Sequence, residues 1–153
     1  MTPSAPLPRL PTLVLACTLL LAACGTPPPA PPTVAERPLY ERLGGLPAIE
    51  AMVDHTIELL TADTRINRRF ENASVPHLRR QLVDLVCLRP GGPCTYTGAS
   101  MSAAHEGRFI RADEFDALVE DVSRSLDYLR VPPRERSELL AMLVQMKSAV
   151  IDH

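Results

Sequence analysis

The residue in this chain best placed to do chemistry is His105. It follows a loop that carries Gly91-Gly92-Pro93 and Tyr96-Thr97-Gly98, and it precedes a helical pattern that opens near Ala112. A histidine at the end of a short segment that faces a helix is suited to axial ligation of haem iron. A histidine in a loop is more often only a surface residue, so the surrounding pattern has to decide between these interpretations.

A second chemistry was considered for the same residue. Ser102 lies one helical turn before His105, and the two side chains could form a hydrolytic dyad. No nucleophile elbow and no third orienting group accompany them. The hydrolase interpretation therefore has little support.

Four apolar stripes with three- and four-residue spacing predict the helices that must position His105. The stripes cover residues 49–60, 78–86, 115–129 and 139–150. No stretch alternates with a period of two, so an all-α fold is expected.

The link between the second and third predicted helices separates two architectures. An up-down helical bundle would not need a link of roughly 20 residues, because most connections are far shorter. A shortened globin, in which two helix pairs clasp a flat cofactor, would use such a link to carry a ligand. His105 lies in this link.

Several short motifs occur in the order found in one family. They are Leu39-Tyr40-Glu41-Arg42-Leu43-Gly44-Gly45, Ala48-Ile49-Glu50, Ala62-Asp63, Phe70, the two loop motifs above, and Met101, His105 and Gly107. Over residues 39 to about 151 the chain resembles the group I truncated haemoglobins. The resemblance implies an all-α truncated globin, a two-over-two helical sandwich around haem, spanning residues 39–153.

The resemblance also implies a set of haem contacts. His105 would be the proximal iron ligand, and apolar side chains would line the haem: Phe70, Leu78, Leu82, Met101, Phe115 and Leu118. No Cys-x-x-Cys-His motif is present, so the expected cofactor is noncovalent haem b. Which of Arg79, Arg80 and Arg108 would pair with the propionates is left open.

The distal side departs from the family pattern. Many relatives carry a tyrosine where this chain has Ile57 and a glutamine where it has Leu82. Loss of a hydrogen bond to a polarised ligand, worth about 1.5–3 kcal/mol, would weaken oxygen binding and favour CO or NO. Thr56, Gln81 or His55 would compensate if helix rotation turned one of them inward. Phe109 replaces a residue that is commonly small in the family.

These features predict a protein that binds a small diatomic ligand, O2, NO or CO, for gas binding, sensing or NO detoxification. NO dioxygenase-type activity would need a separate reductase, because no flavin or nicotinamide motif is visible. The alternative is a haem-free, globin-like interaction module. With 16 basic and 18 acidic residues and no basic block, nucleic acid is not an expected partner.

The N-terminal segment is expected to be an export signal. A short apolar run ends in Leu21-Ala22-Ala23-Cys24, which resembles a bacterial lipobox, so residues 1–23 are predicted to be a lipoprotein signal peptide and Cys24 the lipidated residue. An ordinary signal peptide, or processing at Cys17, are the alternatives. Residues 24–38 are proline-rich and predict an extended tether. The domain would then be anchored to a membrane and face the periplasm.

Cys87 and Cys94 flank the Gly-Gly-Pro loop. In an oxidising compartment this pair is expected to form a disulfide. It would act as a structural staple, or alternatively as a redox-sensitive loop.

Overall fold

The computed structural model describes residues 37–151, which lie in one compact unit of the chain, Pro32–His153. Its elements in chain order are α1 (Leu39–Arg42), α2 (Gly45–Ala62), η2 (Asn67–Arg69), α3 (Val75–Leu88), α4 (Met101–His105), α5 (Ala112–Tyr128), α6 (Pro133–Val144) and η3 (Lys147–Ala149). Within the described residues the only strand-like pairing is an isolated bridge between Ile110 and Ile151. The all-α prediction is confirmed.

The predicted signal segment, residues 1–23, lies outside the described residues, as do Cys24 and all of the proline-rich segment up to Glu36. Over residues 37–151, no helix combines the length and the apolar character needed to cross a bilayer.

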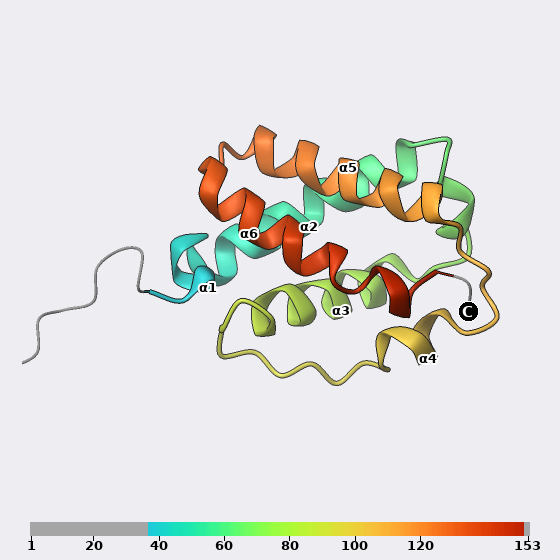
Figure 1. Ribbon diagram of the computed structural model, residues 1–153, viewed down its shortest axis with the longest axis horizontal. Coiled ribbons are helices and arrows are strands. Elements are labelled where there is room, and N and C mark those ends of the chain that lie inside the picture. Colours follow the sequence, from blue (N-terminus) through green and yellow to red (C-terminus); the bar gives the residue numbers. More distant parts are fainter. Residues whose placement is uncertain (1–36, 152–153) are drawn as a thin grey trace, which may run out of the picture. The chain divides into compact units, whose positions relative to one another are not determined.

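The principal helices form two pairs (Figure 1). Helix α2 packs against α3 and also against α5, and α6 packs against α5. The short α1 contacts both α2 and α6, and α4 lies beside η3. This is the predicted two-over-two sandwich. The fourth apolar stripe does not form one helix to Val150, because the chain turns at Gln145–Met146 and resumes as η3, which returns Val150 to the core.

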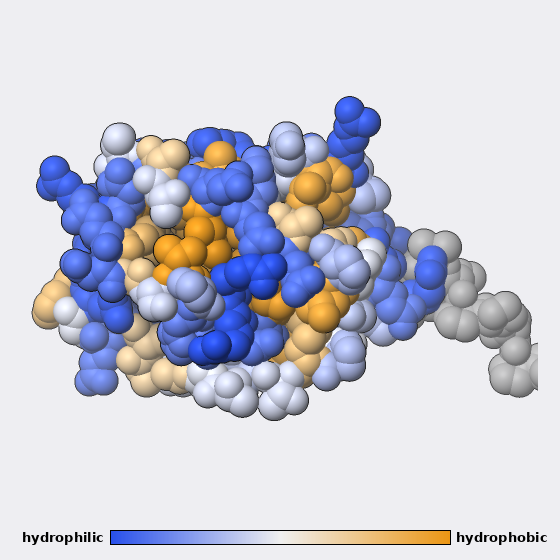
Figure 2. All heavy atoms as spheres, turned by 180° about the vertical axis from the view of Figure 1, so that it is seen from behind, coloured by the Kyte–Doolittle hydropathy of each residue, from blue (hydrophilic) through white to orange (hydrophobic). Residues whose placement is uncertain are grey.

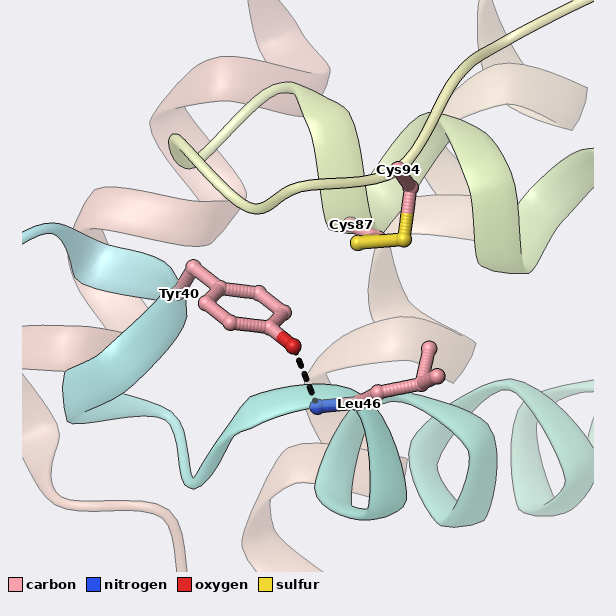
Figure 3. Close-up of a disulfide and its surroundings, with 4 residues drawn as sticks. All are labelled: Tyr40, Leu46, Cys87 and Cys94. Atoms are coloured by element: carbon pink, nitrogen blue, oxygen red, sulfur yellow. Dashed lines mark hydrogen bonds between the residues drawn. A yellow bond between two sulfur atoms is a disulfide. The ribbon is translucent and has the colours of Figure 1, made fainter.

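A glycine pair sets the angle between α1 and α2. Gly44 and Gly45 have φ values of 102° and 73°, a left-handed conformation that side chains with a Cβ rarely adopt. A Cβ on Gly44 would also lie 3.0 Å from the Cβ of Ala48. The folded-back α1 is then held by Tyr40, whose hydroxyl accepts a hydrogen bond of 3.1 Å from the backbone N–H of Leu46 (Figure 3).

A disulfide joins the end of α3 to the segment that leads to α4. The sulfur atoms of Cys87 and Cys94 are bonded, with 5.7 Å between the Cα atoms, and the ring of Tyr40 lies nearby (Figure 3). A Cβ on Gly92 would lie 2.5 Å from the carbonyl oxygen of Cys87 and 2.5 Å from Cδ2 of Tyr40. Glycine is therefore required where this loop passes between the disulfide and α1.

The core consists of two apolar clusters. The larger one lies among α2, α3, α5 and α6 and is built on fully buried residues such as Ile49, Val53 and Leu126. The smaller one, formed by Leu60, Ile66 and Ala117, lies where α2, η2 and α5 meet. On the rear face, apolar atoms are visible on either side of a run of hydrophilic side chains that crosses the middle (Figure 2).

Candidate functional site

The link between α3 and α5 carries His105. After the disulfide loop the chain runs in an extended path alongside α3 and enters α4 (Figure 1). Ser100 caps α4, since its hydroxyl accepts a hydrogen bond of 3.2 Å from the N–H of Ala103. His105 is the last residue of this short helix, and its side chain is half-buried.

A backbone carbonyl selects one tautomer of the neutral His105 imidazole. Its Nδ1 lies 2.7 Å from the carbonyl oxygen of Met101. A carbonyl can only accept, so in the neutral imidazole Nδ1 carries the proton and Nε2 carries a lone pair. This is the arrangement in which a second hydrogen bond fixes the tautomer of a metal-ligating histidine. The described contacts include no hydrogen bond between Ser102 and His105, which leaves the hydrolytic dyad without structural support.

The turn that follows His105 is held by one hydrogen bond of its own backbone and by hydrogen bonds from Arg69. The N–H of Arg108 donates to the carbonyl oxygen of His105 at 3.1 Å, and Phe109 has a positive φ of 49° with its ring 74% exposed. Arg69, from η2, donates to the carbonyl oxygens of Arg108 at 2.8 Å and Phe109 at 3.3 Å. The same guanidinium binds the carboxylate of Glu114 at the start of α5, at 2.9 and 2.7 Å.

Glu114 is a buried carboxylate that accepts hydrogen bonds from a distant arginine and from the backbone next to it. Besides Arg69, it accepts the N–H of Arg111 at 2.9 Å, which caps α5. The hydrogen bonds from Arg69 lower the pKa of Glu114, so the group stays charged. Neither Arg69 nor Glu114 was among the residues predicted for the site.

Three predicted pocket residues line one apolar cavity. Thr56, Leu82 and Leu118 lie on α2, α3 and α5 around a cavity of about 60 Å³. The hydroxyl of Thr56 points along its own helix to the sulfur of Met52, 3.6 Å away. A larger cavity of about 160 Å³ lies towards α1 and shares Met52 and Leu139 with the smaller one.

The other predicted apolar contacts lie in or beside the core. Ile57 is buried in the larger cluster, Phe70 packs against the smaller one together with Leu118, and Leu78 is half-buried on α3. Phe115 is buried, with the ammonium of Lys147 5.5 Å from its ring centroid. Met101 is half-buried and enters the site through its backbone carbonyl.

Two polar residues considered for the distal side face elsewhere. His55 stacks on the ring of Tyr128, at 4.2 Å between centroids, so it lies against α5. Gln81 lies against the segment before α4, because a Cβ on Gly98 would be 2.2 Å from Oε1 of Gln81. That oxygen is buried and has no hydrogen-bond partner within the described residues. Neither residue lines the cavity that Thr56 and Leu82 share.

The three arginines considered for anionic groups differ in their partners. Arg79 is bound to Asp54 and lies near Glu50. Arg80 is hydrogen-bonded to the ring of His77, and Arg108 donates to the carbonyl of Ala104. Among the residues that the structure describes, Arg80 and Arg108 have no carboxylate partner.

Comparison with known proteins identifies relatives of the whole helical unit. Residues 38–152 match the family model described as bacterial-like globin. The chain is 34% identical to a group 1 truncated hemoglobin of Tetrahymena pyriformis, over 61% of this chain and 77% of the relative. The crystal structure of truncated hemoglobin from Tetrahymena pyriformis, in the Fe(III) form, matches with a TM-score of 0.73 and 29% identity over 75% of this chain and 98% of that one. A 2/2 hemoglobin from Synechococcus sp. PCC 7002, solved in the cyanomet state with covalently attached heme, matches with a TM-score of 0.72 and 29% identity over 76% of this chain and 100% of that one.

Proposed function

Since the chain belongs to the bacterial-like globins, and among them to the group 1 truncated haemoglobins, we propose that it binds haem b through His105 and takes up a diatomic gas at the iron. The observation that carries this proposal is the imidazole of His105, whose Nδ1 is hydrogen-bonded to Met101 while Nε2 keeps its lone pair. Haem, when bound, supplies an iron with an open coordination position for O2, NO or CO.

The apolar residues predicted to line the haem fit this cofactor. Phe70, Leu78, Leu82 and Leu118 supply the apolar surface that a porphyrin needs, and each is only partly buried by the protein itself. Arg80 and Arg108, which have no carboxylate partner within residues 37–151, would neutralise the propionates. The absence of a Cys-x-x-Cys-His motif from the sequence favours noncovalent attachment.

The distal residues favour a weakly polar ligand environment. Ile57 and Leu82 offer no hydrogen-bond donor, and the hydroxyl of Thr56 is directed to Met52. The cavity of about 60 Å³ beside Thr56 and Leu82 has room for a diatomic molecule, since one liquid water occupies about 30 Å³. CO and NO therefore suit this site better than stable storage of O2. A role in NO detoxification would require a separate reductase to return the iron to the ferrous state.

The location proposed for the domain is a bacterial membrane facing the periplasm. This rests on the sequence of the N-terminal segment, in which Cys24 would be lipidated and the proline-rich stretch would tether the domain. A disulfide between Cys87 and Cys94 is consistent with an oxidising compartment.

The deciding experiment is the absorption spectrum of the full chain, produced with haem supply, beside that of His105→Ala. A Soret band in the wild type that is lost or altered in the variant supports a histidine-ligated haem. A colourless wild type that also fails to take up added haemin would refute the proposal and leave the haem-free interaction module as the better interpretation.

A further inference from the structure

The backbone of the turn between α4 and α5 is left-handed at Gly107 and at Phe109. Gly107 has a φ of 70°, and a Cβ placed there would meet no atom within 4 Å, so side-chain packing does not hold this position. Two residues later Phe109 adopts a left-handed backbone, with φ of 49°, which is a strained conformation for an aromatic residue. Such strain persists only where surrounding contacts impose it.

One contact that supports this conformation comes from a distant part of the chain. Arg69 lies 40 residues before Phe109 and is the donor to both carbonyl oxygens of the strained peptide region, those of Arg108 and Phe109. One planar guanidinium thereby binds two backbone acceptors and one carboxylate. A fork of fixed donors is the feature that distinguishes arginine from lysine at such a site.

The guanidinium of Arg69 is held in turn by the buried carboxylate of Glu114. The side chain of Glu114 is 8% exposed, and its two oxygens receive the N–H groups of Arg69 and Arg111. Glu114 belongs to the first turn of α5, which packs on α2. The carboxylate therefore connects the turn after α4 to a helix of the core.

We propose that Arg69 and Glu114 form a clamp that positions His105 by fixing the exit turn of α4. The chain of contacts runs from Glu114 to Arg69, from Arg69 to the Arg108 and Phe109 carbonyls, and from the Arg108 N–H to the carbonyl of His105. Arg69 is thus a positioning residue that acts through the backbone and does not touch the imidazole. This inference rests on the proposed function, because the property that it controls is the alignment of the His105 Nε2 with haem iron.

The chain offers a closely matched control. Arg65 lies four residues before Arg69, and it too joins this connection to α5, through a contact of 2.6 Å with Glu120. Within residues 37–151, Arg65 makes no hydrogen bond or ion pair with the exit turn; its other partner is Asp63. Arg65→Ala therefore removes an arginine that bridges the same two parts of the fold and leaves the exit turn untouched.

The test compares Arg69→Ala, Arg69→Lys and Arg65→Ala in the full chain with wild type. Amide hydrogen exchange of the haem-free protein reports on residues 106–111, haem transfer to excess apomyoglobin reports on retention, and resonance Raman of the ferrous protein reports the iron–histidine stretching frequency. Arg69→Ala removes the hydrogen bonds to both carbonyls and to Glu114, and it should raise exchange at these amides and the rate of haem loss by at least about tenfold each, since one hydrogen bond to a charged group is already worth about that factor. It should also shift the iron–histidine frequency. Arg69→Lys should recover part of each effect, and Arg65→Ala should match wild type in all three.

Two results would overturn the clamp. One is a haem-loss rate and an iron–histidine frequency in Arg69→Ala that equal those of wild type, since a purely structural role would change only exchange and stability. The other is unchanged exchange at residues 106–111 in the haem-free variant. This second readout does not need haem, so it judges the clamp even if the wild-type chain proves colourless and the proposed function fails.

Discussion

Asp121 is a buried charge with inadequate compensation, and replacing it should stabilise the protein. Its side chain is fully buried on α5, and neither carboxylate oxygen accepts a hydrogen bond from any residue between 37 and 151. Arg124 places a nitrogen 3.1 Å from Oδ1, but without hydrogen-bond alignment, and that arginine is itself 57% exposed. A buried acceptor left unsatisfied costs about 1–3 kcal/mol. We expect Asp121→Asn, which keeps the shape and removes the charge, to raise the free energy of unfolding at pH 7 by about 1 kcal/mol, because an unpaired amide costs less to bury than an unpaired carboxylate.

The gain in unfolding free energy from Asp121→Asn should increase as the pH rises. Burial, and secondarily the charge of Asp63, raise the pKa of Asp121 above its ordinary value of 3.8. Arg65, Arg124 and Glu120 are the other charged groups near it. A carboxyl whose pKa is raised by folding stabilises the folded state while it is protonated, and this contribution is lost as the pH rises through the folded value. The stability difference between Asp121→Asn and wild type should therefore be small near pH 4 and widen towards pH 7.

The assay is urea unfolding of both proteins in the same haem state, at one-unit steps from pH 4 to pH 7. The midpoint should move while the m-value stays constant. Asp116→Asn is the control, because Asp116 is an exposed carboxylate of the same helix, paired with Lys147, and its removal should bring no such gain. A difference for Asp121→Asn that stays flat with pH, or an asparagine variant less stable than wild type at pH 7, would refute this account of the buried charge.

Three further outcomes are expected. Ile57→Tyr should slow oxygen dissociation from the ferrous protein by about 10- to 100-fold through a new hydrogen bond, measured by stopped flow; an unchanged rate would show that this side chain does not face the bound gas. Replacing both Cys87 and Cys94 by serine should lower the free energy of unfolding by about 2.5 kcal/mol on the chain-entropy model, and wild type treated with reductant should unfold at the same urea concentration as the double variant. Phe109→Gly should stabilise the chain by about 0.5–1 kcal/mol, because relief of left-handed strain exceeds the entropy cost of glycine; a loss of stability in urea would show that the exposed ring contributes packing.

Periodicity predicted the four long helices because each buries a continuous apolar stripe. The stripe at 115–129, for example, corresponds to α5 (Ala112–Tyr128), with Phe115, Val122 and Leu126 buried. The short α1 and α4 have four and five residues, too few for a stripe to repeat, so no periodic signal exists for them. Their stability comes from contacts such as the Ser100 cap and the Tyr40 hydrogen bond, which depend on the folded arrangement.

The sequence singled out His105 through its neighbours but could not supply the tautomer of its imidazole. That depends on a hydrogen bond to the Met101 carbonyl, a backbone atom that has no sequence signature. The orientations of His55 and Gln81 were also beyond prediction, since both lie on the edge of an apolar stripe and a small rotation of the helix decides which neighbour each contacts. In the folded chain, His55 stacks on Tyr128 and Gln81 lies beside Gly98.

The Arg69–Glu114 pair was missed for a different reason. The two residues are 45 positions apart and meet only after η2 is laid against α5. The one local signal was Glu114 in the first turn of a predicted helix, where a carboxylate is ordinarily explained as a cap. Here it caps α5 through Arg111 and also binds Arg69, so a residue with an adequate local role carries a second, long-range one.

The polar contacts of this domain are distributed unevenly about the proposed iron site. On the distal side Ile57 and Leu82 offer no donor, and the nearest hydroxyl, that of Thr56, is directed to Met52. On the proximal side His105 is held through its ring by Met101 and through the turn that Arg69 secures. A bound gas that receives no distal hydrogen bond is stabilised only by the iron itself, so its affinity depends on the bond between iron and His105. Control of gas binding in this chain is therefore expected to lie in the backbone contacts that orient His105.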